Sequence, residues 1–380
     1  MKTVAVITMS DVVNYGSALQ AYATSVLLEK LGYKCLIIDY KYPNVFHIAH
    51  GYNTCKISIA GKIVRFIKSV VRNFIGRKNN WHIVAQNYQK FKQEHLKFTR
   101  RYNTPDELKA DPPIADIYVA GSDQVWSPKY MYEDDVFMLS FVPKGKPKYS
   151  IASSFAADFV PESEQNLYKK YLCEFDGITV REDNGAKIIK DLLNKDVYVC
   201  LDPTLLLGKD FWGGFAEAPT IQKPYLLVYI LDYAINPWEY VSEVIKLVNK
   251  VTYYEIVMLS MPGTSNDIIN PDRVVSPLTP QQFVGFFQNA ACVITSSFHG
   301  TAFAVNFGKP VVSFTEKNGD DRIPSFLNKV GLSKNIYTIG EKNENLSWEY
   351  EAEKVQTKLN EIRNKEVTQI DDMIGNHGNY

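Results

Sequence analysis

The chain has 380 residues, of which 46% are apolar and 22% are charged, with Lys+Arg and Asp+Glu both totalling 42. This ordinary composition excludes a wholly disordered chain, and the zero net charge excludes the overall positive field of a general nucleic-acid binder. At roughly 150 residues per domain, the length predicts two or three domains.

The first 40 residues predict a strand–helix–strand unit. Val4–Thr8 is a short, β-branched apolar run that suits a strand buried on both faces. Ser17 is expected to cap a helix over residues 18–31, which Gly32 ends. Because another apolar run follows at Cys35–Ile38, the sequence predicts a βαβ unit at the N-terminus.

Residues 57–78 depart from this alternation. Their apolar residues follow helical spacing, and the opposite side carries the cations Lys62, Arg65, Lys68 and Arg72. Residues 41–104 hold 13 Lys and Arg against one acid, a local net charge of +12. One interpretation is a basic amphipathic segment that touches anionic lipid, worth about 1 kcal/mol per cation near the surface. The alternative is the solvated face of a helix inserted in the first domain.

Short apolar runs and helical patterns alternate through the rest of the chain, with one interruption. Strands are expected at residues 117–120, 149–152, 177–180, 197–201, 225–231, 256–259, 274–275, 292–295 and 311–314. Helices are expected near residues 238–248 and 280–289, from about residue 301, and near 348–364. The Gly-, Pro- and aromatic-rich stretch at 211–224 is the candidate linker.

This order of elements predicts two doubly wound, Rossmann-like α/β domains that face each other across a cleft. The expected division is an N-terminal α/β domain at 1–210 with a basic helical insertion at about 41–105, a linker at 211–224, a C-terminal α/β domain at 225–345, and a C-terminal helix and tail at 346–380. Ligands of such sheets lie beyond the carboxyl ends of the strands, so the cleft between the domains is the expected site.

The cysteines and the N-terminal residues indicate a reducing compartment. The five cysteines show no zinc-like spacing, and three of them lie in apolar strand-like runs, so reduced thiols and no metal site are expected. Residues 1–9 lack the cationic start of a signal peptide, and no uncharged apolar run reaches about 18 residues. A cytoplasmic protein is therefore expected.

Two polar segments follow expected strands in the N-terminal half. Asn14-Tyr-Gly-Ser17 opens a helix, whose free N–H groups attract anions and polar ligand groups; the alternative is an ordinary capped helix start. Gly121-Ser-Asp-Gln-Val-Trp126 presents its side chains at the cleft. Asp123 and Gln124 could bind sugar hydroxyls and Trp126 could stack on a sugar, whereas the alternative is a tight turn with a core tryptophan.

Three further side chains suit an anionic ligand. Arg181 ends an expected strand, where a forked guanidinium matches a carboxylate or phosphate; the alternative is an Arg–Glu surface pair. His299 stands at a helix start beside the Ser296 and Ser297 hydroxyls, a setting for a proton donor next to a bound anion, although a lone histidine is usually structural. Arg322 is a second candidate anion contact, with an ordinary charged turn as the alternative.

Together these segments resemble the polysaccharide pyruvyl transferase family. The matching pieces are Asn14-Tyr-Gly-Ser-Ala-Leu-Gln-Ala-Tyr22, Gly121-Ser-Asp-Gln-Val-Trp126, Val180-Arg-Glu-Asp183, Leu201-Asp-Pro-Thr204 and Ser297-Phe-His-Gly300, with Gly308-Lys-Pro310 beyond. They run in family order over roughly residues 3–335. The resemblance implies a two-domain fold like that of GT-B glycosyltransferases, with the active site between the domains. It also implies transfer of pyruvate from phosphoenolpyruvate onto two hydroxyls of a sugar, which forms a cyclic ketal and releases phosphate.

The resemblance assigns expected roles to these residues. The family's phosphoenolpyruvate-site arginine and histidine correspond by motif to Arg181 and His299. We expect His299 to act as the general acid and Asp123 to accept a hydroxyl proton. Phosphoenolpyruvate is expected to contact Arg181, His299, Ser296, Ser297 and Arg322. The acceptor is expected to contact the N-terminal domain at Asn14, Tyr15, Gly16, Ser122, Asp123, Gln124 and Trp126.

The expected partners follow from the same resemblance. Phosphoenolpyruvate is the donor substrate, no cofactor is expected, and the acceptor is a sugar or lipid-linked oligosaccharide of a cell-surface polysaccharide precursor. A lipid-linked acceptor would place the protein peripherally at the inner face of the cytoplasmic membrane, through the basic segment. Two alternatives remain open: a nucleotide-sugar-dependent glycosyltransferase of GT-B fold, and a non-catalytic glycan-binding homologue.

Overall fold

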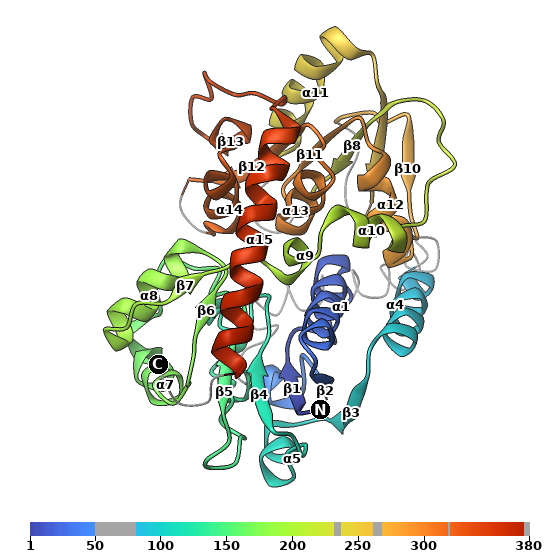
Figure 1. Cartoon of the computed structure of the whole chain (residues 1–380). Helices are drawn as coiled ribbons and strands as arrows, with labels where there is room; N and C mark the ends of the chain where they lie inside the picture. The colour runs from blue at the N-terminus through green and yellow to red at the C-terminus, as the bar shows by residue number, and fades with distance from the viewer. Residues whose placement is uncertain (50–80, 232–236, 261–267, 318–319, 376–380) are drawn as a thin grey trace, which may run out of the picture.

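The computed structural model describes residues 1–49, 81–231, 237–260, 268–317 and 320–375. They form two α/β domains, the N-terminal one below the C-terminal one in Figure 1. The basic segment at 57–78, which carries the expectation of lipid contact, lies outside the described residues.

The N-terminal domain is built on a parallel sheet with the strand order β3-β2-β1-β4-β5. Its strands are β1 (Thr3–Ile7), β2 (Lys34–Tyr40), β3 (Phe98–Tyr102), β4 (Ile117–Ala120) and β5 (Lys148–Ser150). Single bridges join Tyr149 to Gly177 and Ser153 to Val180, so the parallel pair β6 (Thr179–Val180) and β7 (Tyr198–Val199) continues the sheet. Residues 4–7 of β1 are completely buried, because the strand is apolar on both faces.

Helices cover both faces of this sheet. On one face lie α1 (Tyr15–Lys30) and α4 (Trp81–His95). On the other lie α5 (Pro105–Ala110), α6 (Pro128–Met131), η1 (Asp135–Met138), α7 (Glu162–Leu172) and α8 (Asp183–Leu193). The short α2 (Val45–Ala49) follows β2, and α9 (Pro203–Leu206) and α10 (Lys209–Phe215) lead to the second domain.

The C-terminal domain repeats this plan with six parallel strands in the order β10-β9-β8-β11-β12-β13. They are β8 (Tyr225–Tyr229), β9 (Glu255–Leu259), β10 (Arg273–Val275), β11 (Cys292–Thr295), β12 (Val311–Glu316) and β13 (Ile336–Ile339). In each domain the strand order reverses beside the first strand, between β1 and β4 and between β8 and β11. This reversal opens a crevice at the carboxyl ends, where ligands of such sheets bind.

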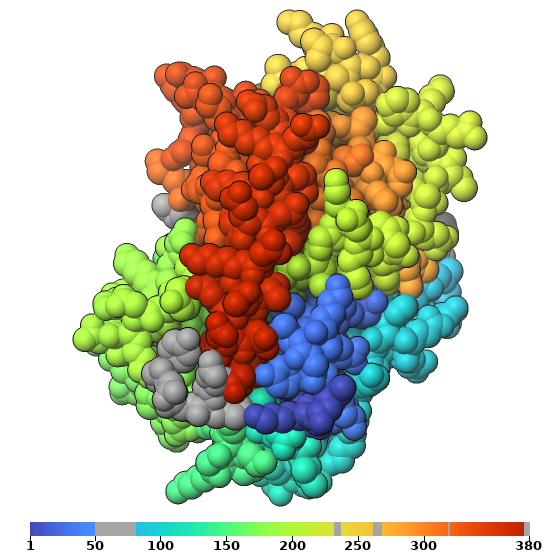
Figure 2. All heavy atoms as spheres, viewed as in Figure 1, coloured from blue at the N-terminus to red at the C-terminus, as the bar shows by residue number. Residues whose placement is uncertain are grey.

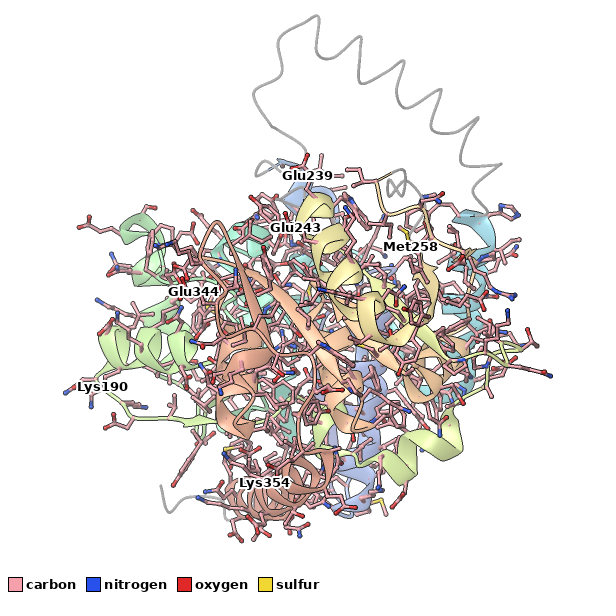
Figure 3. The ribbon with its side chains drawn as sticks, turned by 90° about the horizontal axis from the view of Figure 1, so that it is seen from above. Lys190, Glu239, Glu243, Met258, Glu344 and Lys354 are labelled. Atoms are coloured by element: carbon pink, nitrogen blue, oxygen red, sulfur yellow. The ribbon has the colours of Figure 1, made fainter. Side chains whose placement is uncertain are left out.

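The C-terminal sheet lies between two sets of helices. One face packs on α11 (Trp238–Thr252); the other packs on α12 (Pro280–Asn289), α13 (Phe298–Asn306) and α14 (Arg322–Val330), with η2 (Ser333–Asn335) before β13. In Figure 3 Glu239 and Glu243 mark α11, and Lys354 on α15 (Ala352–Gly375) lies on the opposite side of the sheet. No helix in the described residues is long and apolar enough to cross a membrane.

Helix α15 spans both domains. It forms a ridge that runs from the C-terminal domain down over the N-terminal one (Figures 1 and 2). Near its end, a Cβ placed on Gly177 would lie only 2.6 Å from the Met373 side chain, so the helix is packed tightly against the N-terminal domain.

One hydrophobic core runs through both domains. It includes β1 residues such as Val6, residues of α1, and residues of α12 and α13 from the C-terminal domain. At the junction the Tyr15 ring stacks on Phe283, with ring centroids 4.6 Å apart, and Trp212 packs edge-on against Phe303. The faces of the two sheets that point toward each other therefore share one apolar interior.

The prediction of two doubly wound domains is confirmed, and several details differ. Asn14, not Ser17, caps α1: its side chain accepts a hydrogen bond from the Ser17 N–H at 3.2 Å. The edge strands β3 and β13 were not expected from the sequence. The stretch expected as a linker begins inside α10, where Trp212 is completely buried and its indole N–H donates to the Thr204 carbonyl at 2.8 Å.

Candidate active site

The expected site residues lie where strands of both sheets end. Segment Asn14–Ser17 follows β1, segment Gly121–Gln124 follows β4, and Arg181 follows β6. From the other domain, segment Ser296–His299 follows β11, and Arg322 opens α14. Because these strand ends face each other across the junction, residues almost 300 positions apart meet in one polar cluster.

Asp202 lies at the centre of this cluster. Its Oδ2 accepts hydrogen bonds from Nη1 of Arg181 and from the Ser122 hydroxyl, each at 2.8 Å. The same oxygen lies 3.7 Å from Nε2 of His299. Oδ1 accepts from the backbone N–H and the hydroxyl of Thr204, so Asp202 also caps α9. One carboxylate thus connects an arginine of the N-terminal domain with a histidine of the C-terminal domain.

The surroundings of Asp202 keep its carboxyl ionised. Complete burial alone would raise its pKa, but His299, Arg181 and the Thr204 hydrogen bond hold the pKa of Asp202 far below its usual range. From the sequence, Asp202 was expected only as part of the motif Leu201-Asp-Pro-Thr204, without a role of its own. The available signal was an acid directly after an expected strand that ends at residue 201.

Asp123 is the second carboxylate of the cluster. It accepts a hydrogen bond from the Ser17 hydroxyl at 2.6 Å, and its other oxygen lies 3.6 Å from Nη2 of Arg181. Its backbone has a φ of 76°, a left-handed conformation that costs a non-glycine residue about 1–3 kcal/mol. Such strain is typical of residues whose side chain must point to one place, here the junction of the domains.

His299 packs against the backbone of the opposite domain. A Cβ placed on Gly16 would lie 2.0 Å from Nδ1 of His299, so the imidazole occupies the space that any larger residue at position 16 would fill. Ser297 caps α13, accepting a hydrogen bond from the Gly300 N–H at 3.3 Å, and the histidine stands in the first turn. Nε2 of His299 has no hydrogen-bond partner among the described residues.

Arg322 reaches the same region from α14. With its amide oxygen turned toward the guanidinium, Gln124 accepts hydrogen bonds from Nη1 and Nη2 of Arg322 at 2.9 and 3.2 Å. Asp320 forms a bidentate ion pair with Arg322, with Nε donating to Oδ1 and Nη2 donating to Oδ2. Burial alone would lower the pKa of Arg322, but Asp320 and more distant carboxylates raise it above its usual value. Arg322 is therefore a second fixed cation on the C-terminal side.

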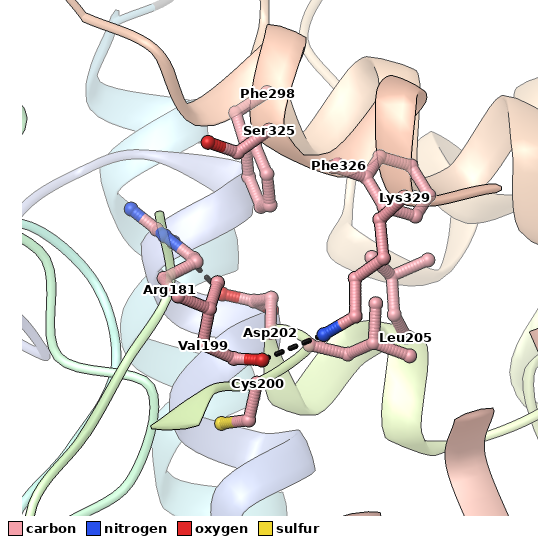
Figure 4. A pocket seen from close by; sticks show the side chains of 10 residues that line it. Arg181, Val199, Cys200, Asp202, Leu205, Phe298, Ser325, Phe326 and Lys329 are labelled. Carbon is pink, nitrogen blue, oxygen red and sulfur yellow. Dashed lines mark hydrogen bonds and ion pairs between the residues drawn. The ribbon is translucent and has the colours of Figure 1, made fainter. Parts of the chain in front are cut away.

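Arg181 has N–H donors that make no hydrogen bond in the described residues. Its guanidinium lies 4.5 Å from the centre of the Phe298 ring, and Nε and Nη2 have no hydrogen-bond partner within the described part of the chain. Arg181, Phe298 and Ser325 are among the residues that line a cavity of about 10 Å³, which has room for about one water molecule. Figure 4 shows the side chains around it. Although Nη2 lies 3.6 Å from Asp123, these buried N–H groups make no hydrogen bond in the described residues, and such groups of a cation are suited to an anionic ligand.

Five of the expected ligand contacts have structural roles in this fold. Trp126 is completely buried and its indole N–H donates to the Phe137 carbonyl at 3.1 Å, so its ring has no free face for a sugar and the sugar-stacking prediction is wrong. The Tyr15 hydroxyl donates to the Leu278 carbonyl at 3.2 Å, which joins the domains. The Ser296 hydroxyl exchanges hydrogen bonds with the backbone of Leu231. Asn14 and Ser297 serve as helix caps.

Comparison with known proteins identifies the family of this chain and the type of fold. The family model described as polysaccharide pyruvyl transferase matches residues 14–318, which include every residue of the cluster except Asp320 and Arg322. No curated protein sequence matches the chain significantly.

Solved structures share the fold at low sequence identity. S. aureus MnaA, solved with UDP, aligns with a TM-score of 0.51 and 13% identity, covering 98% of this chain and 90% of that one. A Listeria monocytogenes protein assigned as a UDP-N-acetylglucosamine 2-epimerase aligns with a TM-score of 0.50 and 13% identity, covering 98% of this chain and 90% of that one. The calicheamicin glycosyltransferase CalG4 aligns with a TM-score of 0.49 and 10% identity over the whole of both chains. The first two alignments support a GT-B-like fold for this chain. At 13% identity they support the fold alone.

Proposed function

The chain belongs to the polysaccharide pyruvyl transferase family, and on that premise we propose that it transfers pyruvate from phosphoenolpyruvate onto two hydroxyls of a sugar. The product is a cyclic ketal on a precursor of a cell-surface polysaccharide, and phosphate is released. The observation that carries the proposal is the meeting of Arg181 and His299, from different domains, at the Asp202 carboxylate.

The donor's charges fit the cations of the cluster. Phosphoenolpyruvate carries a phosphate and a carboxylate on one small molecule. Arg181 and Arg322 offer two fixed guanidinium groups, and two donor nitrogens of Arg181, Nε and Nη2, have no hydrogen-bond partner in the described residues. Forked arginine donors match both kinds of anion. Fixed cations in a buried site also stabilise charge that develops on the departing phosphate.

The reaction needs proton transfers that His299 and Asp123 can perform. One sugar hydroxyl adds to the central carbon of the donor while the methylene carbon gains a proton and becomes a methyl group. The carbon–oxygen bond to phosphate then breaks, and the second hydroxyl adds to the same carbon. Two hydroxyl protons are released, of which one balances the methyl group and one the phosphate. We assign His299 as the proton donor to carbon and Asp123 as the acceptor of a hydroxyl proton.

Asp202 orients these groups. Its carboxylate lies beside both Arg181 and His299, and its low pKa keeps it ionised. It can therefore hold the guanidinium and the imidazole in place throughout the reaction. The Asp202 carboxylate is itself held in place at the start of α9, because the backbone N–H and the hydroxyl of Thr204 both donate to its Oδ1.

Donor binding is tested by thermal unfolding with and without phosphoenolpyruvate. At about 100 times its dissociation constant, a ligand adds about 2.7 kcal/mol to the free energy of unfolding. With about 2.1 cal/mol/K of unfolding entropy per residue, this raises the Tm of a chain of this length by about 3 °C. Arg181→Lys keeps a charge beside Asp202 but loses the forked donor, so it should abolish most of the rise.

The matched control is Arg273→Lys. Arg273 is an exposed arginine on β10 that pairs with Glu255, outside the cluster. The rise should persist in this variant. A rise with uridine or guanosine diphosphate and none with phosphoenolpyruvate would instead contradict the proposal and favour a nucleotide-sugar-dependent glycosyltransferase.

A further inference from the structure

Glu182 is a buried carboxyl next to the donor site that the proposed reaction does not use. It follows Arg181, precedes α8 and is completely buried. Its Oε1 accepts hydrogen bonds from the backbone N–H groups of Phe155 at 2.7 Å and Ala156 at 3.3 Å. Its Oε2 has no hydrogen-bond partner among the described residues. Because a buried carboxylate oxygen without a donor is costly, Oε2 is the atom that would carry a proton.

Glu182 anchors the backbone segment 153–156 through its hydrogen bonds to Phe155 and Ala156. This segment supports two residues of the site. Within this segment, the Ser153 carbonyl accepts a hydrogen bond from the Arg181 N–H at 3.1 Å. The neighbouring Ser154 N–H donates to the Asp123 carbonyl at 3.0 Å. One short segment, anchored by Glu182, thus sets the backbone positions of both Arg181 and Asp123.

Charged groups from two elements face Glu182. Burial is the largest influence and raises the pKa of Glu182. Arg181 and Arg322 lower this pKa, whereas Asp320 and Asp321 raise it further. The resulting pKa is about 7. The two arginines that favour its ionised form are those we assign to the donor. A bound dianion would neutralise their attraction and add repulsion, so it would favour the protonated carboxyl.

We propose that Glu182 is a positioning residue of the donor site and that its carboxyl is protonated whenever an anion occupies the cleft. The identity of the anion rests on the proposed function; the coupling to a proton rests on the geometry of Glu182, its backbone partners and the two arginines. By linkage, an ionised Glu182 must weaken anion binding to the same extent that the bound anion disfavours ionisation.

Glu182→Gln tests the proposal, because the amide keeps the Oε1 acceptor and stays neutral at every pH. Dissociation constants for phosphoenolpyruvate and for inorganic sulfate are measured by calorimetry on wild type and variant. In wild type, binding relative to the variant should weaken about tenfold between about pH 6 and about pH 8. Taking the ratio of the two proteins removes titration of the donor itself, and sulfate does not titrate in this range. Exposed Glu344→Gln (Glu344 is labelled in Figure 3) is the matched control and should follow wild type.

A second readout needs no ligand. The folded pKa of Glu182 lies above the usual value for an unfolded chain, about 4.3. Its contribution to stability is therefore complete below about pH 4 and is lost as the pH rises to about 7. Wild type should lose unfolding free energy over this window relative to Glu182→Gln.

Each outcome decides the inference. Parallel binding profiles for wild type and variant overturn it, even where phosphoenolpyruvate binds and the proposed function stands. Sulfate binding with the expected pH dependence, without any binding of phosphoenolpyruvate, supports the inference and overturns the proposed donor. Failure of wild type to bind either anion at millimolar concentration, or parallel stability profiles, overturns the inference.

Discussion

Among single residues, Gly16 is essential to the site because it has no side chain. The imidazole of His299 lies where a Cβ at position 16 would be, 2.0 Å from Nδ1. Gly16 lies in the first turn of α1 and has no left-handed backbone, so it is the close approach of His299 that requires glycine here. The N-terminal domain therefore sets the position of the proposed proton donor, which belongs to the C-terminal domain.

Gly16→Ala should displace His299 and remove activity while the protein stays folded. The imidazole must rotate away from Asp202, and misplacement of a catalytic group by about 1 Å can cost about 100-fold in rate. We expect a loss of at least this size in kcat, measured as phosphate released from phosphoenolpyruvate in the presence of acceptor.

The control for this prediction is Gly214→Ala. Gly214 lies in α10 with no atom within 4 Å of an added Cβ, and alanine favours a helix over glycine. Activity should match wild type. Full activity in Gly16→Ala would contradict the proposed position of His299 in catalysis.

The sequence predicted which residues gather at the site better than it predicted their contacts. Arg181, His299 and Asp123 were expected because each follows a strand, and the carboxyl ends of parallel strands share one edge. The central place of Asp202 was not expected, since its partners lie 21 and 97 positions away and no local pattern links them. Trp126 was assigned to the sugar because a tryptophan after a strand suits either a ligand or a core, and only packing decides between them.

Among the elements of secondary structure, the buried strands and the edge strand β10 were predicted, and the two edge strands β3 and β13 were missed. The runs in β1, β4 and β11 are continuously apolar because both faces are covered. Strand β3 carries Arg100 and Arg101, which pair with acids at the sheet edge, and β13 is half-exposed along its length. Neither shows the hydrophobic signal of an interior strand, so the pattern did not predict them.

The N-terminus of α8 shows how separate elements complete each other. The backbone N–H of Asp183 donates to the Ser325 hydroxyl at 3.0 Å, and that of Asn184 donates to the Asp321 carboxylate at 2.9 Å. Both acceptors belong to the C-terminal domain. The helix that begins just after Arg181 and Glu182 is thus capped by the segment that carries Arg322, so the two cations of the proposed donor site are fixed to each other.

The basic segment at 57–78 is expected to bind anionic membranes. Residues 57–78 carry six Lys and Arg and no acid, and at about 1 kcal/mol per cation they should bind anionic lipid strongly. We expect the protein to sediment with vesicles that contain phosphatidylserine and to remain in the supernatant with neutral vesicles. Binding should fall as salt is added. Equal recovery in both supernatants would remove the proposed role at a membrane surface.

At the scale of the whole molecule, the shared core makes the two domains one cooperative unit. Domains joined by a small polar interface move and unfold separately, whereas a large apolar interface couples them. Here the apolar interior continues from β1 and α1 into α12 and α13, and α15 packs along both domains. We therefore expect one thermal transition, with a calorimetric enthalpy equal to the van't Hoff enthalpy.

Arg363 is the residue that tests this coupling. From α15 its Nε donates to the Leu205 carbonyl of α9, and its Nη2 donates to the Asn306 side chain of α13 at 2.8 Å. Burial lowers the pKa of Arg363 to about 10, in keeping with its almost complete enclosure. Arg363→Ala leaves buried acceptors on both α9 and α13 without donors, at a cost of about 3 kcal/mol.

The transition of Arg363→Ala should move as a whole, by about 4 °C for a chain of this length, because the unfolding entropy is about 2.1 cal/mol/K per residue. Exposed Lys354→Ala on the same helix (Figure 3) should leave the Tm within about 1 °C, as expected of surface substitutions. Two resolved transitions, of which Arg363→Ala shifts only one, would show that the domains unfold independently. The Asp202 cluster would then form at a junction that can open on its own. A single shifted transition means instead that Arg181 and His299 meet in a preformed site, held by the same core that stabilises the fold.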